Sequence, residues 1–183
     1  MKKIAFILLI VIIFGALKTT SVQAQNNFTG EIQNLFSQGE ITSTFKGFFS
    51  HSYNNELGMF AFTFINKYWA ETYVGPTWKP NEFIMFGAGA GIEQIEGFWR
   101  VGGFIGAGYK NCHVLILLED GASGFWYQAV ADVKLHELLK IGIMAESKLD
   151  VGPTVEIGLP GQPVKLWGTI FKDSQYAGIK FNF

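Results

Sequence analysis

The last nine residues, QYAGIKFNF from Gln175 to Phe183, alternate strictly between two kinds of side chain. One face of this stretch is wholly apolar and consists of Ala177, Ile179, Phe181 and Phe183. The other face is mixed and consists of Tyr176, Gly178, Lys180 and Asn182. Successive side chains of a β-strand point to opposite sides, so a period of two predicts a strand. The chain is therefore expected to end in a strand with one apolar face.

Similar runs follow one another from Ile41 onward, each about 9 to 13 residues long. Most of the short connections between them contain Asn, Asp, Gly or Pro, the residue types that supply hairpin geometry. A tilted strand that crosses a bilayer needs about 9–11 residues. Eleven such runs are visible after residue 40, and Phe28–Phe36 supplies a candidate twelfth.

The N-terminus has the features of an export signal. Lys2 and Lys3 precede the apolar segment Ile4–Leu17, and Val22-Gln23-Ala24 fits the small-x-small cleavage rule. We expect residues 1–24 to be a cleaved signal peptide and Gln25 to begin the mature chain. The apolar segment is too short for the ~20 residues of a spanning helix.

Composition narrows the class of protein further. Fourteen Lys and Arg face fifteen Asp and Glu, and this balance favours neither nucleic acid nor an anionic surface as a partner. Cys112 is the single cysteine, so an internal disulfide is excluded. Eighteen Phe and 22 Gly accompany a mean hydropathy of only +0.22. No run after residue 24 approaches the ~18 apolar residues of a membrane helix. A membrane protein of this kind must be a closed barrel, because only closure satisfies every backbone polar group in lipid.

The terminal strand, apolar on one face and ending in Phe183, resembles the closing strand of small bacterial outer-membrane β-barrel proteins. The resemblance implies an outer-membrane location, with outer-membrane lipids around the barrel. It also implies that Phe181 and Phe183 form the signal read by the outer-membrane insertion machinery. Both termini usually face the periplasm in this class, so the strand number should be even.

The expected fold is therefore all-β, an antiparallel up-and-down transmembrane β-barrel of about 12 strands. Residues 41–183 form the barrel, and residues 25–40 form either its first strand or a plug. The alternative is a barrel of ten strands with an N-terminal helix within Asn26–Gln38.

Alternation separates a lipid face from a lumen. In Phe98–Tyr109 the odd positions are mostly apolar, whereas the even positions carry Arg100 and three glycines. Leu138–Lys148 and Val151–Leu159 show the same apolar-out, polar-in pattern, which is typical of membrane barrels. Aromatic residues ten positions apart span roughly 23 Å of a tilted strand, close to the spacing of the two aromatic girdles. Four residues are expected at the membrane interfaces: Tyr68, Trp78, Trp99 and Tyr109.

The inward positions predict a charged lumen. The expected pore-lining residues are Glu71, Glu93, Arg100, Asp132, Lys134, Glu146, Glu156, Lys165 and Lys180, with Lys148 on the same predicted face. A two-residue turn at Glu96-Gly97 would place Glu93 directly opposite Arg100. These charges serve either to compensate one another in a filled lumen or to select solutes in a pore.

One part of the predicted lumen is aromatic instead. A two-residue turn at Asn66-Lys67 puts Phe60, Phe62, Phe64, Trp69 and Tyr73 on one face with Glu71. A three-residue turn further on would place Tyr73 opposite Gly87, which reads as packing of a large side chain against a glycine. The alternative is an apolar wall for a hydrophobic ligand.

Nothing in the chain indicates catalysis. Ser50-His51-Ser52 lies near Glu56, but adjacent strand residues point to opposite faces, so His51 cannot activate Ser52. His113 and His136 lack ligand spacing, so no metal and no cofactor are expected. The expected function is a narrow pore or permeability-related protein. The alternatives are a structural or assembly barrel with a filled lumen, a lipid-binding barrel and, last, a lipid-modifying enzyme.

Overall fold

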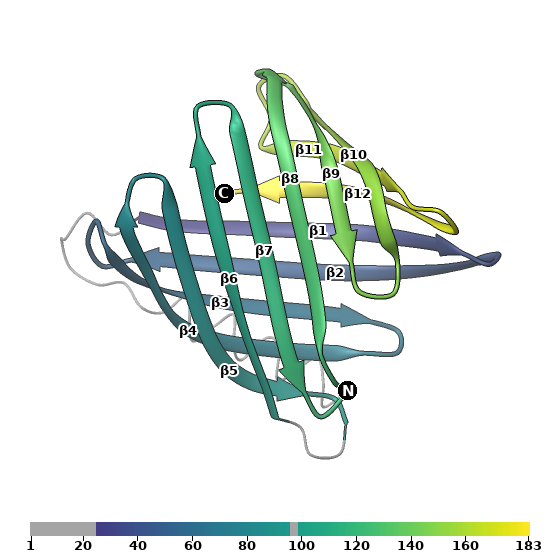
Figure 1. The fold of residues 1–183 in the computed structure, drawn as a ribbon, viewed down its shortest axis with the longest axis horizontal. Coiled ribbons are helices and arrows are strands. Elements are labelled where there is room, and N and C mark those ends of the chain that lie inside the picture. The colour runs from purple at the N-terminus through teal and green to yellow at the C-terminus, as the bar shows by residue number, and fades with distance from the viewer. Residues whose placement is uncertain (1–24, 96–98) are drawn as a thin grey trace.

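The computed structural model describes residues 25–95 and 99–183, which form a closed barrel of twelve antiparallel strands (Figure 1). Each strand pairs with its neighbours along the chain, and β1 pairs with β12 to close the sheet. The strands are β1 Gln25–Ser37, β2 Glu40–Ser52, β3 Leu57–Asn66, β4 Ala70–Asn81, β5 Ile84–Glu93, β6 Trp99–Tyr109, β7 Cys112–Gly121, β8 Trp126–His136, β9 Leu139–Glu146, β10 Asp150–Gly158, β11 Val164–Ile170 and β12 Ser174–Asn182. The predicted signal peptide lies outside the described residues.

The first strand completes the barrel. Ile32 in β1 pairs with Phe45 in β2 on one side and with Ile179 in β12 on the other. The twelve-strand prediction is confirmed. The alternative of a plug helix within Asn26–Gln38 is wrong, because this segment is paired along both edges.

We call the barrel end that holds Gln25 and Phe183 the near end, and the opposite end the far end. Tight turns join the strands at both ends. Gln38 and Gly39, at the far end, have φ of 50° and 81°, as a two-residue hairpin turn requires. The side chain of Asn66 accepts hydrogen bonds from the backbone N–H of Tyr68 and Trp69 at 2.8 and 2.7 Å.

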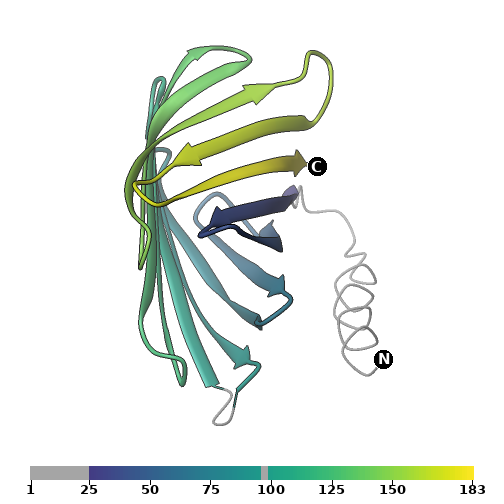
Figure 2. The same cartoon turned by 90° about the vertical axis from the view of Figure 1, so that its right-hand side faces the viewer.

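Strands on opposite walls of the barrel run in very different directions. Strands β6 to β8 are steep in Figure 1, whereas β1 to β4 lie nearly across them, and Figure 2 shows the two walls from the side. Strong tilt of each strand relative to the barrel axis produces this crossing. Among the described residues, no helix is long and apolar enough to cross a membrane.

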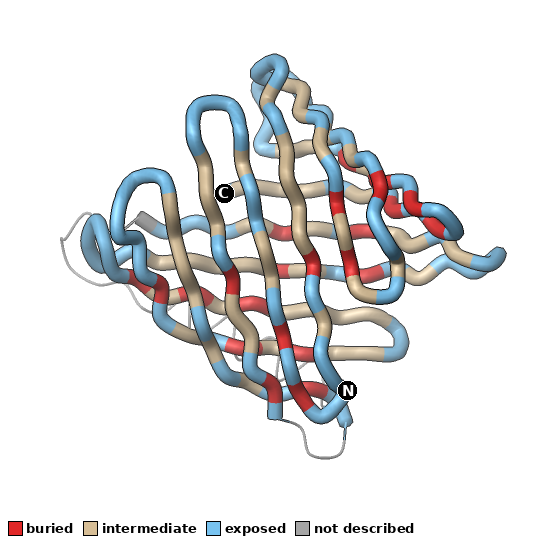
Figure 3. Tube along the Cα trace, in the orientation of Figure 1, coloured by how far each residue is buried: buried red, intermediate tan, exposed pale blue. Residues whose placement is uncertain are grey.

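The outer surface is apolar and exposed. Outward residues such as Ile143, Val155 and Ile157 are 56, 40 and 48% exposed, respectively. In Figure 3, buried or half-buried positions alternate with exposed ones along many strands. Water would penalise so much exposed apolar area, whereas a bilayer solvates it. The apolar-out, polar-in alternation predicted for β6, β9 and β10 is therefore observed.

Two predicted residue pairings are wrong. Arg100 lies opposite Gly91 rather than Glu93, because five residues and not two separate β5 from β6. Tyr73 lies opposite Gly91 rather than Gly87, because β4 extends to Asn81 and the turn to β5 therefore falls later in the chain than predicted. The turn between β3 and β4 falls one residue later than Asn66-Lys67, which shifts each pairing by two residues but keeps the predicted shared face, with Phe62 opposite Tyr73 and Phe64 opposite Glu71.

Candidate functional site: the barrel lumen

A salt-bridge cluster occupies one side of the lumen at the far end. Arg100 lies at the start of β6, and its guanidinium contacts three carboxylates from β4, β5 and β7. Nε lies 2.8 Å from Glu71 Oε2, Nη1 lies 2.7 Å from Glu93 Oε2, and Nη2 lies 2.6 Å from Glu119 Oε2. All four side chains are buried, with at most 5% of each exposed. We call these four residues the Arg100 cluster.

Hydrogen bonds tie the Arg100 cluster to its surroundings. The Trp69 indole donates to Glu71 at 2.8 Å, and the Tyr73 hydroxyl donates to Glu119 at 3.0 Å. The backbone N–H and the hydroxyl of Ser123 donate to the Glu93 carboxylate at 2.7 and 2.8 Å. One cation therefore holds three carboxylates, and neutral donors satisfy their remaining lone pairs.

A second polar group fills the other side of the far end. Glu146, at the end of β9, accepts hydrogen bonds from Gln128 Nε2 at 2.5 Å and from the Tyr176 hydroxyl at 2.9 Å. No cation of the described part of the chain forms an ion pair with Glu146, which is 6% exposed. The far half of the lumen thus contains four carboxylates and one guanidinium.

Aromatic side chains pack beneath the Arg100 cluster. Phe60, Phe62, Tyr73 and Phe104 form a buried group in which the Phe60 and Phe104 rings meet edge to face at 5.1 Å. Glycines make room for two of these rings. A Cβ on Gly102 would lie 2.7 Å from the Tyr73 ring, and one on Gly87 would overlap the Phe104 ring. The Tyr73–glycine packing is therefore real, but its partner is Gly102 rather than Gly87.

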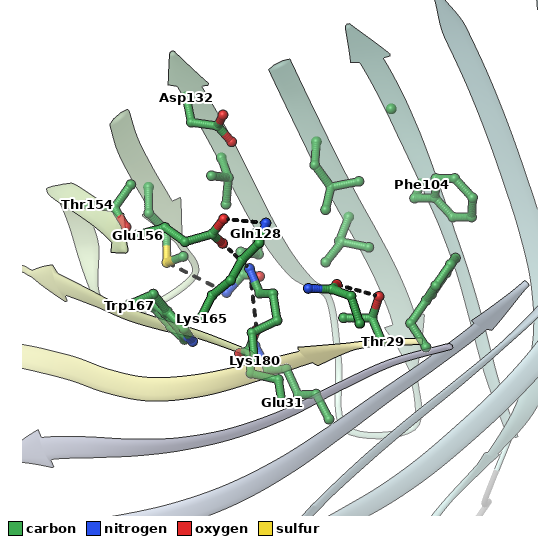
Figure 4. A pocket seen from close by; sticks show the side chains of 18 of the residues that line it. Thr29, Glu31, Phe104, Gln128, Asp132, Thr154, Glu156, Lys165, Trp167 and Lys180 are labelled. Atoms are coloured by element: carbon green, nitrogen blue, oxygen red, sulfur yellow. Dashed lines mark hydrogen bonds and ion pairs between the residues drawn. The ribbon is translucent and has the colours of Figure 1, made fainter. Parts of the chain in front are cut away.

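The half of the lumen nearer the termini contains a cavity of about 430 Å³. Figure 4 shows Asp132, Glu156, Lys165 and Lys180 on one side of this cavity and Phe104 on the other. The polar lining consists largely of Thr29, Glu31, Lys46, Gln128, Asp132, Lys140, Thr154, Glu156, Lys165, Lys180 and Asn182. The apolar lining includes Phe48, Phe62, Met85, Phe104, Leu115, Leu117, Val130, Met144 and Trp167.

Glu156 organises the charges of this cavity. Its carboxylate lies 2.8 Å from Lys165 Nζ, 2.9 Å from Lys180 Nζ and 3.9 Å from Lys140 Nζ. Lys140 also lies 3.5 Å from Asp132, and Lys180 lies 3.9 Å from Glu31. The three lysine side chains are 26 to 34% exposed, so this network is far more open than the Arg100 cluster.

The predicted lumen residues thus separate into two groups. Glu71, Glu93, Arg100 and Glu146 lie in the packed far half, whereas Asp132, Glu156, Lys165 and Lys180 line the cavity. Lys134 is half-buried near the end of β8. The prediction for Lys148 is wrong, because β9 ends at Glu146 and Lys148 lies in the following turn with φ of 73°.

Sequence reasoning missed several interior residues. Glu146 was placed inside because even-numbered positions of this strand face the lumen. Lys140 is also at an even position of β9, so its inward orientation could have been predicted. The inward orientation of Glu119 could not have been predicted in this way. Leu115 and Leu117 make much of the inward face of β7 apolar, so this strand shows no clear alternation of apolar and polar residues. Phe64 and Trp69, from the predicted aromatic wall, are half-buried, and Phe62 lines the cavity.

The predicted interface and terminal aromatics lie on the exterior. Trp99 is 50% exposed and Tyr68 is 63% exposed toward the far end, while Trp78 and Tyr109 are 52 and 59% exposed toward the near end. Phe183 is 69% exposed, and Phe181 is partly exposed on the same strand face. Roles for these residues in membrane anchoring or insertion stay predictions.

The histidines have ordinary polar partners. His51 Nδ1 lies 2.7 Å from the side-chain oxygen of Asn26, and its ring packs on Tyr53 at 4.8 Å. His113 Nδ1 lies 3.1 Å from Asp132 at the lumen mouth. Within the described ranges, no group of three or more His, Cys, Asp or Glu side chains is arranged to hold a metal ion.

Neither a family model nor a curated protein matches the sequence. Solved structures do match. The KdgM porin has a TM-score of 0.59 and 13% identity, over 85% of this chain and 99% of that one. The KdgM porin in complex with disordered oligogalacturonate has a TM-score of 0.57 and 12% identity, over 85% of this chain and 99% of that one. The NanC porin has a TM-score of 0.52 and 8% identity, over 83% of this chain and 98% of that one.

The chain therefore has the fold of the small outer-membrane β-barrels, and specifically the barrel shape of porins. Identity of this order establishes the shared fold and not a shared solute. Together with the apolar exterior, the fold points to the bacterial outer membrane.

Proposed function

We propose that this protein is a narrow, non-enzymatic pore whose lumen charges select the solutes that pass. The observation that carries the proposal is the charged layer at the far end, where Arg100, three partner carboxylates and Glu146 lie inside the barrel. Apolar residues would fill a purely structural lumen at lower desolvation cost. Charged rings at a constriction are what ion-selective channels use.

The two halves of the lumen suit two parts of such a pathway. The cavity of about 430 Å³ is a vestibule lined by lysines and carboxylates. The far layer is its constriction, and within the described residues it is built of strand side chains rather than of an inserted helix. Opening this layer therefore requires rotation of side chains such as Tyr73 and Tyr176. The neighbour solved with oligogalacturonate supports the idea that a barrel of this shape can take up a solute.

Replacing Glu146 tests the proposal. Glu146→Gln keeps the side-chain shape and one acceptor oxygen but removes a negative charge from the constriction. We expect the permeability ratio of K⁺ to Cl⁻, measured from reversal potentials in planar bilayers under a salt gradient, to fall severalfold. The control is Lys172→Gln, which removes an exposed charge in the turn before β12. Absence of channels from correctly folded protein, or an unchanged reversal potential in Glu146→Gln, would contradict the pore.

A further inference from the structure

The cavity in the near half has two chemically different walls. Lysines from β2, β9, β11 and β12 line one wall: Lys46, Lys140, Lys165 and Lys180. Apolar side chains from β2, β3, β5, β6 and β7 line the other: Phe48, Phe62, Met85, Phe104, Leu115 and Leu117. The lysine wall also contains three apolar residues, Val130, Met144 and Trp167, on β8, β9 and β11. In Figure 4, Lys165, Lys180 and Glu156 lie with Trp167 on one side of the open space, and Phe104 lies across from them.

The apolar wall is unusual for a water-filled lumen. Leu115 faces inward on the same side of β7 as Leu117 and Glu119, yet it is 40% exposed. Apolar area that is left in contact with water is unfavourable relative to the same area buried. Nothing from the described chain covers this surface, so a hydrocarbon group entering the cavity would bury it.

The basic wall has capacity for another anion. Four lysines line the cavity with three carboxylates, Glu31, Asp132 and Glu156. Lys140, Lys165 and Lys180 all contact Glu156, and in the described part of the chain only Lys140 and Lys180 have a further carboxylate nearby, Asp132 at 3.5 Å and Glu31 at 3.9 Å, respectively. Lys46 has no ion pair within the described ranges, and its Nζ lies 5.8 Å from the centre of the Phe64 ring. The carboxylate of a bound ligand could therefore form ion pairs with these partly exposed ammonium groups after small rotations of the lysine side chains.

We infer that this cavity binds an amphiphilic anion, namely a carboxylate carried on a medium-length hydrocarbon chain. The carboxylate lies at Lys165 and Lys180, and the chain lies along Leu115, Leu117 and Phe104. The cavity of about 430 Å³ lies within the ~300–1,000 Å³ range of small-molecule pockets, so it suits a ligand of about a dozen non-hydrogen atoms. Decanoate, with ten carbons and two oxygens, has this size.

The experiment measures equilibrium binding of decanoate to the barrel in nanodiscs by titration calorimetry, with empty nanodiscs subtracted for bilayer uptake. We expect saturable 1:1 binding that weakens at least tenfold in Lys165→Gln/Lys180→Gln and severalfold in Leu115→Asn. Lys172→Gln, outside the cavity, should bind as the wild type does. Acetate, which lacks the chain, and decanol, which lacks the charge, should both bind much more weakly.

A gel shift between heated and unheated samples verifies that each variant is a folded barrel. Uptake of decanoate equal to that of empty nanodiscs would overturn the inference, and so would equal binding by the double lysine variant or by decanol. Because binding is measured without a transmembrane gradient, its failure is distinguishable from failure of conduction, and the inference does not require the pore.

Discussion

The two halves of the lumen are built from the same strands and the same inward alternation, yet one is packed and the other is hollow. In the far half, Arg100 contacts three carboxylates at 2.6 to 2.8 Å, and its side chain is 4% exposed. In the near half, three lysines surround Glu156 at 2.8 to 3.9 Å and keep 26 to 34% of their side chains exposed. Inward polarity by itself therefore does not determine whether a barrel is filled.

The size of the side chains that lie over the inward-facing glycines of β6 explains much of the difference in packing between the two halves. In the far half, the Tyr73 ring lies over Gly102, and its hydroxyl reaches Glu119 from a non-adjacent strand. In the near half, a Cβ on Gly106 would meet only one atom within 4 Å, the Met85 carbonyl oxygen at 3.9 Å. The glycines of β6 thus accommodate large rings at one end and border open space at the other.

The largest effect is expected from breaking the Arg100 cluster. Arg100→Gln leaves three buried carboxylates without their cation, and loss of one partner of a buried ion pair typically costs about 3–5 kcal/mol. Lys165→Gln, in the open network, should cost about 1 kcal/mol or less because Glu156 keeps Lys180. The measurement is the urea concentration at which each barrel loses its heat-modifiable gel band. Equal loss of stability in both variants would show that the two halves are energetically alike.

An intermediate effect on stability is expected when one glycine of β6 in each half of the lumen is replaced by alanine. The Cβ of Gly102→Ala would lie 2.7 Å from the buried Tyr73 ring, and overpacking of this kind costs about 1–3 kcal/mol. Gly106→Ala on the same strand enters open space and should be nearly neutral. Urea unfolding of this matched pair measures the difference. A stability change at Gly106 as large as at Gly102 would mean that the near half is packed too.

The smallest stability effect is expected from Glu156→Gln. Its three lysine partners are partly exposed, so water can solvate their ammonium groups when the carboxylate is replaced by a neutral amide. The loss in free energy of unfolding should therefore be about 1 kcal/mol. The same change leaves the basic wall without its central anion, and decanoate should then bind severalfold more tightly in the calorimetric titration. Weaker decanoate binding by the folded variant would indicate that Glu156 contacts the ligand favourably instead of competing with it.

Much of the architecture could be predicted because it depends on local pattern. The predicted turn near Asn66 correctly put Phe62 and Tyr73 on one face, and parity correctly placed Ile143 outside and Glu146 inside. Registers failed where strand ends were misjudged, as with Gly91 and not Glu93 opposite Arg100. The Glu93–Arg100 ion pair nevertheless forms, because a long guanidinium side chain reaches past its directly paired neighbour.

Sequence alone determined that this chain closes into a twelve-strand barrel with an apolar exterior, since strand length, turn residues and alternation are properties of neighbouring residues. Only the tertiary structure decided how the interior is divided. Tyr73 in β4 meets Glu119 in β7, 46 positions away, and Glu156 in β10 reaches Lys180 in β12. Such contacts depend on the curvature and tilt that bring non-adjacent strands together, and no local pattern in the chain records that geometry.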